Sequence, residues 1–277
     1  MKHTIKLLAG LALALSLSTA YGFDLQQELR NAARELKKPG KISELGGYSE
    51  EEEHAIGREI AGNLLGAAPL VKDAKLQKYV NSVGRWVADQ SERPDLEWHF
   101  GVIESNDVNA FAAPGGYIFV TKGLYKLLQN EAELAGVLAH EVGHVIRKHH
   151  LKLLQQSKLV DLGGKLLEKQ AGGNEKIRNL IGSGAEIVAR SLDKGAEFEA
   201  DRIGVVLTAR AGYDAYGLPQ VLQEIGHAGS GNSDSVALLF KTHPHPDERL
   251  AKLGDAMDDH FDGIKGLDLP KRFYRIK

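Results

Sequence analysis

The chain has 277 residues, 43% of them hydrophobic, and its 35 basic and 37 acidic side chains give a formal net charge of −2. This length suits one large domain or a domain with appendages. The balanced charge, without a basic patch or motif, gives no indication of a nucleic-acid partner. Cysteine is absent, which excludes disulfides and cysteine metal ligands and leaves the core to stabilise the fold.

The first 22 residues have the pattern of a secretory signal peptide. Lys2 and Lys6 flank the start of an apolar segment over residues 7–17, and small residues follow up to Gly22. The apolar segment is shorter than the roughly 20 residues that span a membrane. We therefore expect cleavage after Ala20 or Gly22, with an uncleaved anchor as the alternative, and a bacterial periplasm as the location.

Helical spacing predicts three helices before the first strand. Residues 23–37 form a short leading helix within an N-terminal lead over 23–44, and residues 76–87 form a helix with one packed face. Between them, Ser49 precedes a run of four glutamates that opens a helix through residue 65. We expect this acidic run to be solvated.

Two strands are predicted next, over residues 98–103 and 117–121. Pro114, Gly115 and Gly116 form a turn before the second strand. The segment 109–121 leads directly toward the longest predicted helix. We expect it to offer an edge strand that holds an extended peptide by backbone hydrogen bonds. An ordinary buried hairpin is the alternative.

The remainder of the chain reads as helical. Helices are predicted from residue 124, from Glu131, over 189–211 up to Gly212, over 216–227, and from the proline-rich segment 240–249 to Met257. A stretch over 151–189 is broken by glycine pairs and is either a mobile lid or membrane-facing flap, or a plain helical hairpin. The predicted fold class is therefore mainly α with a small β-sheet.

The helix from Glu131 contains the pattern H-E-x-x-H at His140, Glu141 and His144. Residues four apart lie on the same face of a helix, so both imidazoles can be directed at one cation. Glu141 lies about 100° around the helix from His140, where it can reach a water at the ion without binding the ion. This is the position of a general base, and the pattern predicts a catalytic metal site.

A catalytic zinc site usually has three protein ligands, so a third is needed. His150 would suit a longer three-histidine pattern, but that pattern requires glycine at 147, where this chain has Arg147. We therefore expect the helix to continue and to carry His150 away. Glu168 is at a plausible distance along the chain but lacks an acidic partner one turn further on.

Glu197 is the preferred third ligand, with Asp201 one turn further along the same helix face. Ala200 and Gly204 are small enough for two helices to approach closely. A carboxylate at the position of Asp201 can then accept the ring N–H of a ligating histidine. Glu199 points away and is expected to be solvated.

These residues resemble the HtpX-like and BepA-like zinc metallopeptidases, relatives of the CAAX prenyl protease and of mitochondrial Oma. The resemblance covers roughly residues 45–255 and rests on the His140-Glu141-x-x-His144 helix, the Glu197-x-x-x-Asp201 helix, the segment 109–121 and Thr242-His243-Pro244. It implies a helical gluzincin-type domain with a small sheet, one zinc ion on His140, His144 and Glu197, and Glu141 as base.

The resemblance also places His243 near the zinc, as a fourth ligand that closes the site or as a donor to the developing oxyanion. The flanking prolines stiffen its backbone, and His245 is the less favoured of the two histidines. Arg249 would pair with Asp201 or with a substrate carbonyl. Glu141, Asp201 and His243 thus form the predicted catalytic set.

We therefore predict a zinc endopeptidase of the bacterial cell envelope that cleaves misfolded or membrane-associated proteins, with peripheral membrane association as a further expectation. The alternative is a chaperone-like holdase whose zinc site His243 keeps inactive. A purely structural zinc site is disfavoured, because such sites mostly use cysteine. The predicted division is a signal peptide (1–22), a helical lead (23–44), the metallopeptidase domain (45–257) and a C-terminal tail (258–277).

Overall fold

The computed structural model describes residues 48–155, 192–230, 236, 239, 242–261 and 263–276. The predicted signal peptide, the leading helix, Glu168 and most of the glycine-broken stretch lie outside these ranges. The described helices and strands are α4 (Glu50–Ala67), α5 (Ala74–Ala88), β1 (His99–Ile103), β2 (Ala110–Ala113), β3 (Tyr117–Thr121), α6 (Lys122–Leu127), α7 (Glu131–Ile146), α10 (Lys194–Arg210), α11 (Gly217–Ser230), α13 (Pro246–Met257) and the 3-10 turn η4 (Asp258–Phe261). The fold is mainly α with a small β-sheet, as predicted.

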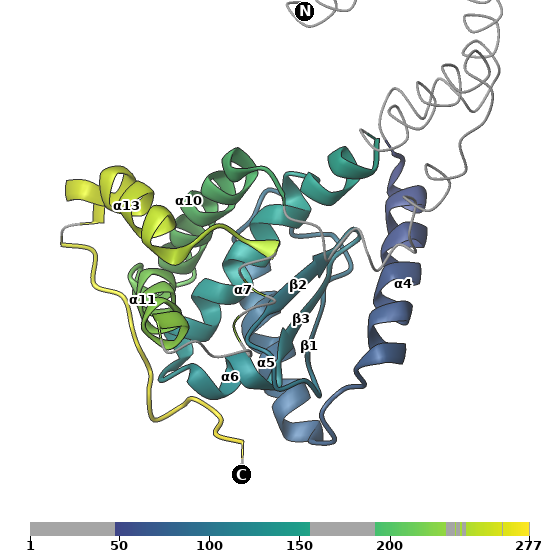
Figure 1. The fold of residues 1–277 in the computed structure, drawn as a ribbon, viewed down its shortest axis with the longest axis horizontal. Helices are drawn as coiled ribbons and strands as arrows, with labels where there is room; N and C mark the ends of the chain where they lie inside the picture. Colours follow the sequence, from purple (N-terminus) through teal and green to yellow (C-terminus); the bar gives the residue numbers. More distant parts are fainter. Residues whose placement is uncertain are drawn as a thin grey trace, which may run out of the picture. The chain divides into compact units, whose positions relative to one another are not determined.

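Helix α7 is the centre of the domain. Residues 131–145 are all buried, between the sheet on one side and α10, α11 and α13 on the other (Figure 1). Asn130 caps the start of α7, because its side chain accepts the backbone N–H of Glu133 at 2.9 Å. A helix that is buried all round has no solvent-facing side, so its polar residues need partners inside the protein.

The sheet has three strands in the order β1-β3-β2, with β1 parallel and β2 antiparallel to β3. Its two faces bury different clusters, as alternation along a strand requires. Phe111 and Phe119 pack with α4, whereas Ala112 and Ile118 face the main core. The predicted strand 117–121 is therefore central rather than an edge.

The two outer strands of this sheet differ in how their edges are covered. On β1, Gln77 of α5 bonds to both backbone groups of Val102 at 2.9 Å, and Asn81 accepts the N–H of Phe100. On β2, Asn109 accepts the N–H of Thr121 from β3, so by alternation the backbone groups of Ala110 and Ala112 point away from the sheet. Among the described strands, β2 thus has an edge without a neighbouring strand, although its four residues are buried and Asn109 Oδ1 already accepts the N–H of Ala110 at 3.0 Å.

The acidic run at the start of α4 was expected to be solvated, and for Glu53 this expectation is wrong. The preceding three glutamates are exposed, but Glu53 is only 1% exposed. Its carboxylate accepts Arg93 at 2.8 Å, Lys148 at 2.9 Å and the N–H of Gly115 at 3.3 Å. These contacts join α4 to the β2–β3 turn and to the end of α7, which a helical pattern alone does not reveal.

The ionisation of Glu53 is expected to make the unfolding free energy depend on pH. Burial opposes its ionisation, but Arg93 and Lys148 outweigh burial and hold the pKa of Glu53 below its ordinary value of 4.5. The stabilisation is therefore present above pH 4.5 and is lost as the pH falls through the lower folded-state pKa. We expect Glu53→Gln to lower the unfolding free energy at pH 7 by about 2 kcal/mol, the scale of charged hydrogen bonds.

Urea unfolding of wild type and Glu53→Gln at several pH values measures this effect. Other acids also have lowered pKa values, so the difference between the two proteins, rather than either curve, isolates Glu53. The difference should shrink toward zero at low pH. Glu52→Gln, at an exposed position of the same run, is the matched control. A constant difference down to pH 2 would contradict the assignment.

The C-terminal segment, expected as a tail, packs against the domain over residues 263–276. The carbonyl of Asp268 accepts the N–H groups of Glu131 and Ala132 at the start of α7. The side chain of Arg272 pairs with Glu131, which also accepts the hydroxyl of Tyr213 at 2.7 Å. This segment therefore completes the N-terminal end of the central helix.

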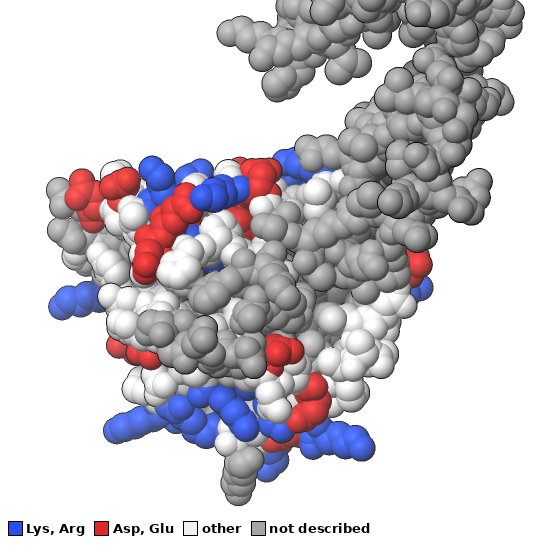
Figure 2. Space-filling model, in the orientation of Figure 1, with Lys and Arg blue, Asp and Glu red and all other residues white. Residues whose placement is uncertain are grey.

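Lys and Arg side chains gather along the lower edge of the face drawn in Figure 2, and both signs of charge mix along its upper edge. No helix in the described ranges is long and apolar enough to cross a membrane.

Candidate metal and active site

Helices α7 and α10 approach closely because small residues face each other at their contact. A Cβ atom added at Gly143 would lie 3.2 Å from the Cα of Ala200, and one added at Gly204 would lie 3.1 Å from the backbone nitrogen of His140. This is the close approach predicted from Ala200 and Gly204. It brings the first turn of α10 beside the H-E-x-x-H residues.

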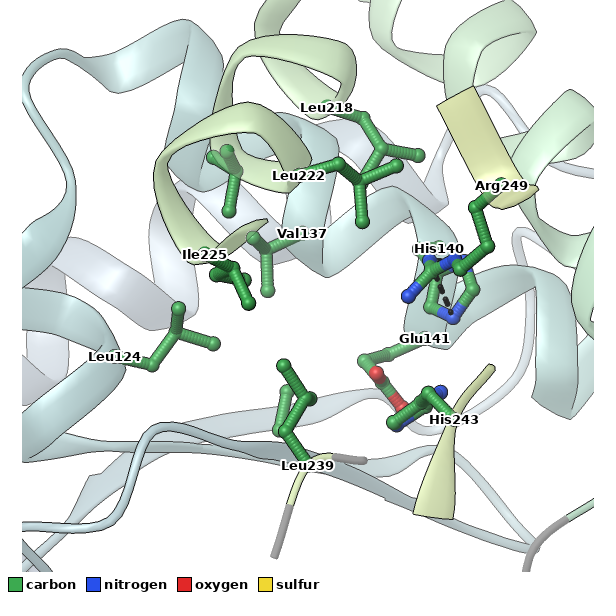
Figure 3. A pocket seen from close by; sticks show the side chains of 12 residues that line it. Leu124, Val137, His140, Glu141, Leu218, Leu222, Ile225, Leu239, His243 and Arg249 are labelled. Atoms are coloured by element: carbon green, nitrogen blue, oxygen red, sulfur yellow. Dashed lines mark hydrogen bonds between the residues drawn. The ribbon is translucent and has the colours of Figure 1, made fainter. Parts of the chain in front are cut away.

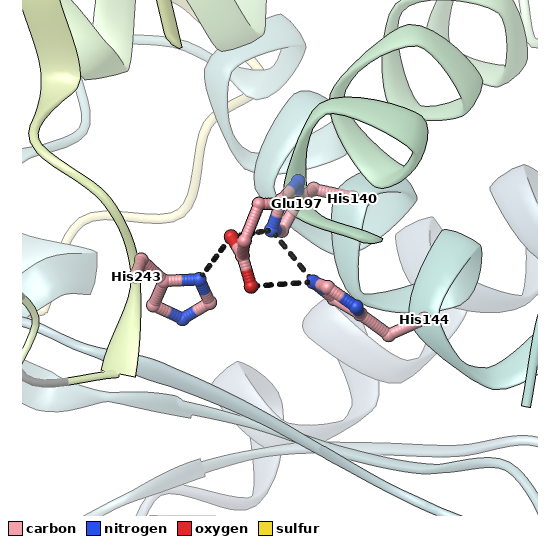
Figure 4. A group of neighbouring side chains, drawn as sticks. All are labelled: His140, His144, Glu197 and His243. Carbon is pink, nitrogen blue, oxygen red and sulfur yellow. Dashed lines mark hydrogen bonds and ion pairs between the residues drawn. The ribbon is translucent and has the colours of Figure 1, made fainter. Parts of the chain in front are cut away.

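The described residues contain one group suited to hold a metal ion: His140, His144, Glu197 and His243. Their ligand atoms all lie within 4.8 Å of one another, and all four side chains are buried (Figure 4). The Nε2 atoms of His140 and His144 are 3.0 Å apart. Glu197 lies 3.7 Å from the first and 3.5 Å from the second.

The contacts of His140 and Glu197 fit a cation between the two rings. His140 Nδ1 lies 2.9 Å from Asp201 Oδ1, and a carboxylate only accepts, so Nδ1 carries the hydrogen. In the neutral ring Nε2 is then a lone pair that faces His144 Nε2. Glu197 Oε1 is buried and has no hydrogen-bond donor. A lone pair on His140 and an orphaned carboxylate oxygen fit a bound cation.

The electrostatic environment of His144 and Glu197 favours the protonation states that bind metal ions. Burial lowers the pKa of His144 well below its usual value and so keeps the ring neutral, the form that binds metals. For Glu197, burial is outweighed by His243 and His144, which hold the pKa of its carboxyl far below the ordinary value. Ionised glutamate and neutral imidazole are the species that ligate divalent ions.

Asp201 and Arg249 both contact the ring of His140. Arg249 forms a two-point ion pair with Asp201 at 2.9 and 2.5 Å, and both side chains are at most 4% exposed. Burial opposes ionisation, but Arg249 holds the pKa of Asp201 far below its usual range. Of the two predicted partners of Arg249, the structure shows Asp201.

Glu141 lies beside the group but is not part of it. Its side chain is 3% exposed and lines a cavity of about 10 Å³ together with His144, Glu197 and His243. That is room for about one water. Burial raises the pKa of Glu141, although His140 and His243 partly counteract it. A carboxyl with a raised pKa is suited to accept and return a proton.

His243 is buried and is hydrogen-bonded to Glu197. Its Nδ1 donates to Glu197 Oε2 at 2.7 Å, and its ring is 5.5 Å from that of His140 between centroids. Burial opposes protonation, but the carboxylate of Glu197 raises the pKa of His243. His245 is exposed and caps the start of α13, where its side chain accepts the N–H of Asp247.

A second cavity, of about 30 Å³, opens beside Glu141 (Figure 3). His140, Glu141, His243 and Arg249 form its polar side. The rest of its wall is aliphatic, from Ala110, Leu124, Val137, Leu218, Val221, Leu222, Ile225 and Leu239. Edge strand β2 thus borders both cavities, through Ala110.

The expectation that the helix would carry His150 away is wrong. Helix α7 ends at Ile146, and Lys148 adopts a left-handed conformation with φ of 55°. The chain turns there without the glycine that such a turn favours. His149 and His150 are therefore buried beside the ring of His144, although neither belongs to the metal-ligand group.

Sequence reasoning also missed Glu199, which was expected to point away into solvent. It is partly exposed, but Glu199 Oε2 lies 3.3 Å from His149 Nε2. No local sequence pattern indicated a contact between Glu199 and His149, because that contact depends on the turn at Lys148.

The fold and this site define a metallopeptidase of the H-E-x-x-H type. The chain belongs to Peptidase family M48, whose model matches residues 74–257. It is 32% identical over 209 residues to the beta-barrel assembly-enhancing protease of Yersinia pestis, covering 73% of this chain and 43% of that protein. The protein of the same name from Escherichia coli is 31% identical over 210 residues, covering 72% of this chain and 42% of the relative.

A more distant relative is the mitochondrial metalloendopeptidase OMA1 of Arabidopsis thaliana, which is 28% identical over 188 residues and covers 68% of this chain and 37% of that protein. The chain therefore matches less than half of the length of these relatives. The family membership establishes the class of the protein, a metallopeptidase.

Proposed function

We propose that the protein is a zinc-dependent endopeptidase of the bacterial cell envelope that cleaves misfolded or membrane-associated proteins. The observation that carries this proposal is the convergence of two imidazole nitrogens and an orphaned glutamate oxygen beside Glu141. His140, His144 and Glu197 would hold the zinc, since two histidines and a glutamate are a ligand set of catalytic zinc sites.

Bound zinc would supply a Lewis acid that polarises the scissile carbonyl and lowers the pKa of water. Glu141 takes the proton from the attacking water and returns it to the leaving amide nitrogen. Asp201 holds His140 in the tautomer that leaves Nε2 free. His243, which now donates to Glu197, would donate a hydrogen bond to the developing oxyanion instead.

The substrate would bind as an additional strand along β2. The carbonyl of Ala110 and both backbone groups of Ala112 face this edge, so they would pair with an extended segment that displaces what now buries the strand, and backbone pairing does not read side chains. Such a mode selects unfolded chains, because folded proteins rarely offer a free extended segment.

The envelope location rests on the predicted signal peptide and on the relatives named for beta-barrel assembly. The test of the activity is removal of the metal. We expect the zinc-loaded chain to hydrolyse a denatured protein, to stop when a chelator strips the metal, and to recover when stoichiometric zinc is returned. Undiminished hydrolysis by protein shown to be metal-free would overturn the proposal.

A second candidate, a holdase with an inactive zinc site, is favoured by the position of His243. With His243 the group offers four ligand atoms, and a fourth protein ligand would occupy the position that a catalytic site keeps open. We expect His243→Ala to raise proteolysis of a model unfolded substrate several-fold if His243 closes the site. A loss of proteolysis would instead assign it to the oxyanion. His245→Ala, at the exposed neighbour, is the control.

A further inference from the structure

His149 contacts a proposed metal ligand on the side that faces away from the metal group. Its Nδ1 lies 2.9 Å from His144 Nδ1, its Nε2 lies 3.3 Å from Glu199 Oε2, and it is 5% exposed. We propose that His149 and Glu199 are a positioning pair that sets the tautomer and orientation of His144. This inference rests on the proposed metal site.

The hydrogen positions along this chain of contacts are consistent with one another. Glu199 only accepts, so His149 Nε2 carries the hydrogen and donates it. The neutral ring of His149 then has a lone pair on Nδ1, which accepts a hydrogen from His144 Nδ1. His144 Nε2 is left with its lone pair directed at His140 and Glu197, as a metal ligand requires.

The two ligands of α7 would thus be held in the same way by different residues. His140 donates to Asp201, which Arg249 holds by a buried ion pair. For His144, the corresponding acceptor is an imidazole, and Glu199 provides the charge behind it. An outer partner that fixes the ring of a ligating histidine commonly strengthens metal binding about 10- to 100-fold.

The surrounding chain holds this pair in place at both ends. Lys148, whose left-handed conformation directs His149 toward His144, pairs with the buried Glu53 at 2.9 Å. Glu199 pairs with Arg147 at 3.2 Å, and Arg147 pairs with Glu92 at 3.1 Å. A turn stabilised on both sides indicates that the position of His149 is determined by the fold rather than by the metal.

The test compares two substitutions of His149 in the full chain. His149→Asn keeps an acceptor near the position of Nδ1, whereas His149→Leu leaves His144 Nδ1–H buried without an acceptor. We expect zinc affinity, measured by competition with a chromophoric chelator, to fall about 10- to 100-fold for His149→Leu. His149→Asn should recover most of that loss. The visible spectrum of the Co²⁺-loaded protein should shift in the leucine variant.

Leu151→Ala is the control for a purely structural effect. Leu151 is equally buried and lies in the same segment, so its truncation should lower the melting temperature while zinc affinity stays within about twofold of wild type. If His149→Leu does not fold, Glu199→Ala at a partly exposed position tests the outer contact, with a few-fold loss of affinity expected.

The inference fails if His149→Leu and Glu199→Ala both bind zinc as tightly as wild type, or if His149→Asn loses as much affinity as His149→Leu. His144→Ala separates this failure from failure of the proposed site. If His144→Ala loses zinc while His149→Leu does not, only the positioning role is wrong. If His144→Ala binds zinc at wild-type affinity, the proposed site and the inference are both wrong.

Discussion

Glu141→Gln is expected to reduce peptide hydrolysis by at least about 10²- to 10⁴-fold, the usual contribution of a general base. Glutamine has the shape of glutamate but cannot take the proton of the attacking water. The Glu141 side chain is buried in the small cavity between His144 and His243, where no other described carboxylate except Glu197 lines the space. Glu197 is committed to the metal in the proposed site and cannot replace the base.

Two measurements make this result specific to the chemistry. Zinc content and melting temperature of Glu141→Gln should match wild type, because Glu141 is not among the metal-ligand group. Glu224→Gln, at an exposed position of α11, is the matched control and should keep full activity. Digestion of an unfolded protein by Glu141→Gln at the wild-type rate would remove Glu141 from the mechanism.

Glu197→Ala is expected to lose the metal itself. Without Glu197 the pair on α7 offers only two nitrogens, and zinc sites in proteins usually have three or four protein ligands. Affinity should fall by more than about 100-fold, the upper end for loss of an outer partner alone. Addition of zinc should then no longer raise the melting temperature, because stabilisation by a ligand requires binding to the folded state.

His243 sharpens this prediction, since its ring could supply a third nitrogen to a site that lacks Glu197. The double variant Glu197→Ala/His243→Ala removes that route and should bind no zinc at micromolar metal. Metal analysis and calorimetry of both variants, with Glu224→Ala as control, measure the outcome. Equimolar zinc at wild-type affinity in the double variant would show that the metal lies elsewhere.

The elements nearest the site could be predicted because their signals are local. His140, Glu141 and His144 are related by helical spacing alone, which places them correctly on one helix before its neighbours are known. The approach of α10 was predictable from Ala200 and Gly204, because small residues on one face permit close packing. The roles of His140 and His144 as metal ligands and of Glu141 as the base remain predictions.

Three features escaped prediction because they depend on contacts between distant segments. Lys148 turns the chain in a conformation that lysine rarely adopts, so its residue type carried no signal. Glu53 stands in an acidic run typical of a solvated surface, and its partners Arg93 and Lys148 lie far from it in the sequence. The edge strand is β2 rather than β3, since strand order in a sheet is not encoded by alternation within one strand.

The amino-acid sequence by itself determined the chemistry available to this protein, because residue type and helical spacing decide which donors one helix can present to a cation. Only the tertiary structure decided which distant groups complete that site. Glu197 and His243 were expected near the pair, but the packing of α10 and the loop before α13 set their distances from it, and the turn at Lys148 alone brings His149 beside His144. Such placements follow from the burial of whole helix faces and from paired charges, which no short window of residues contains.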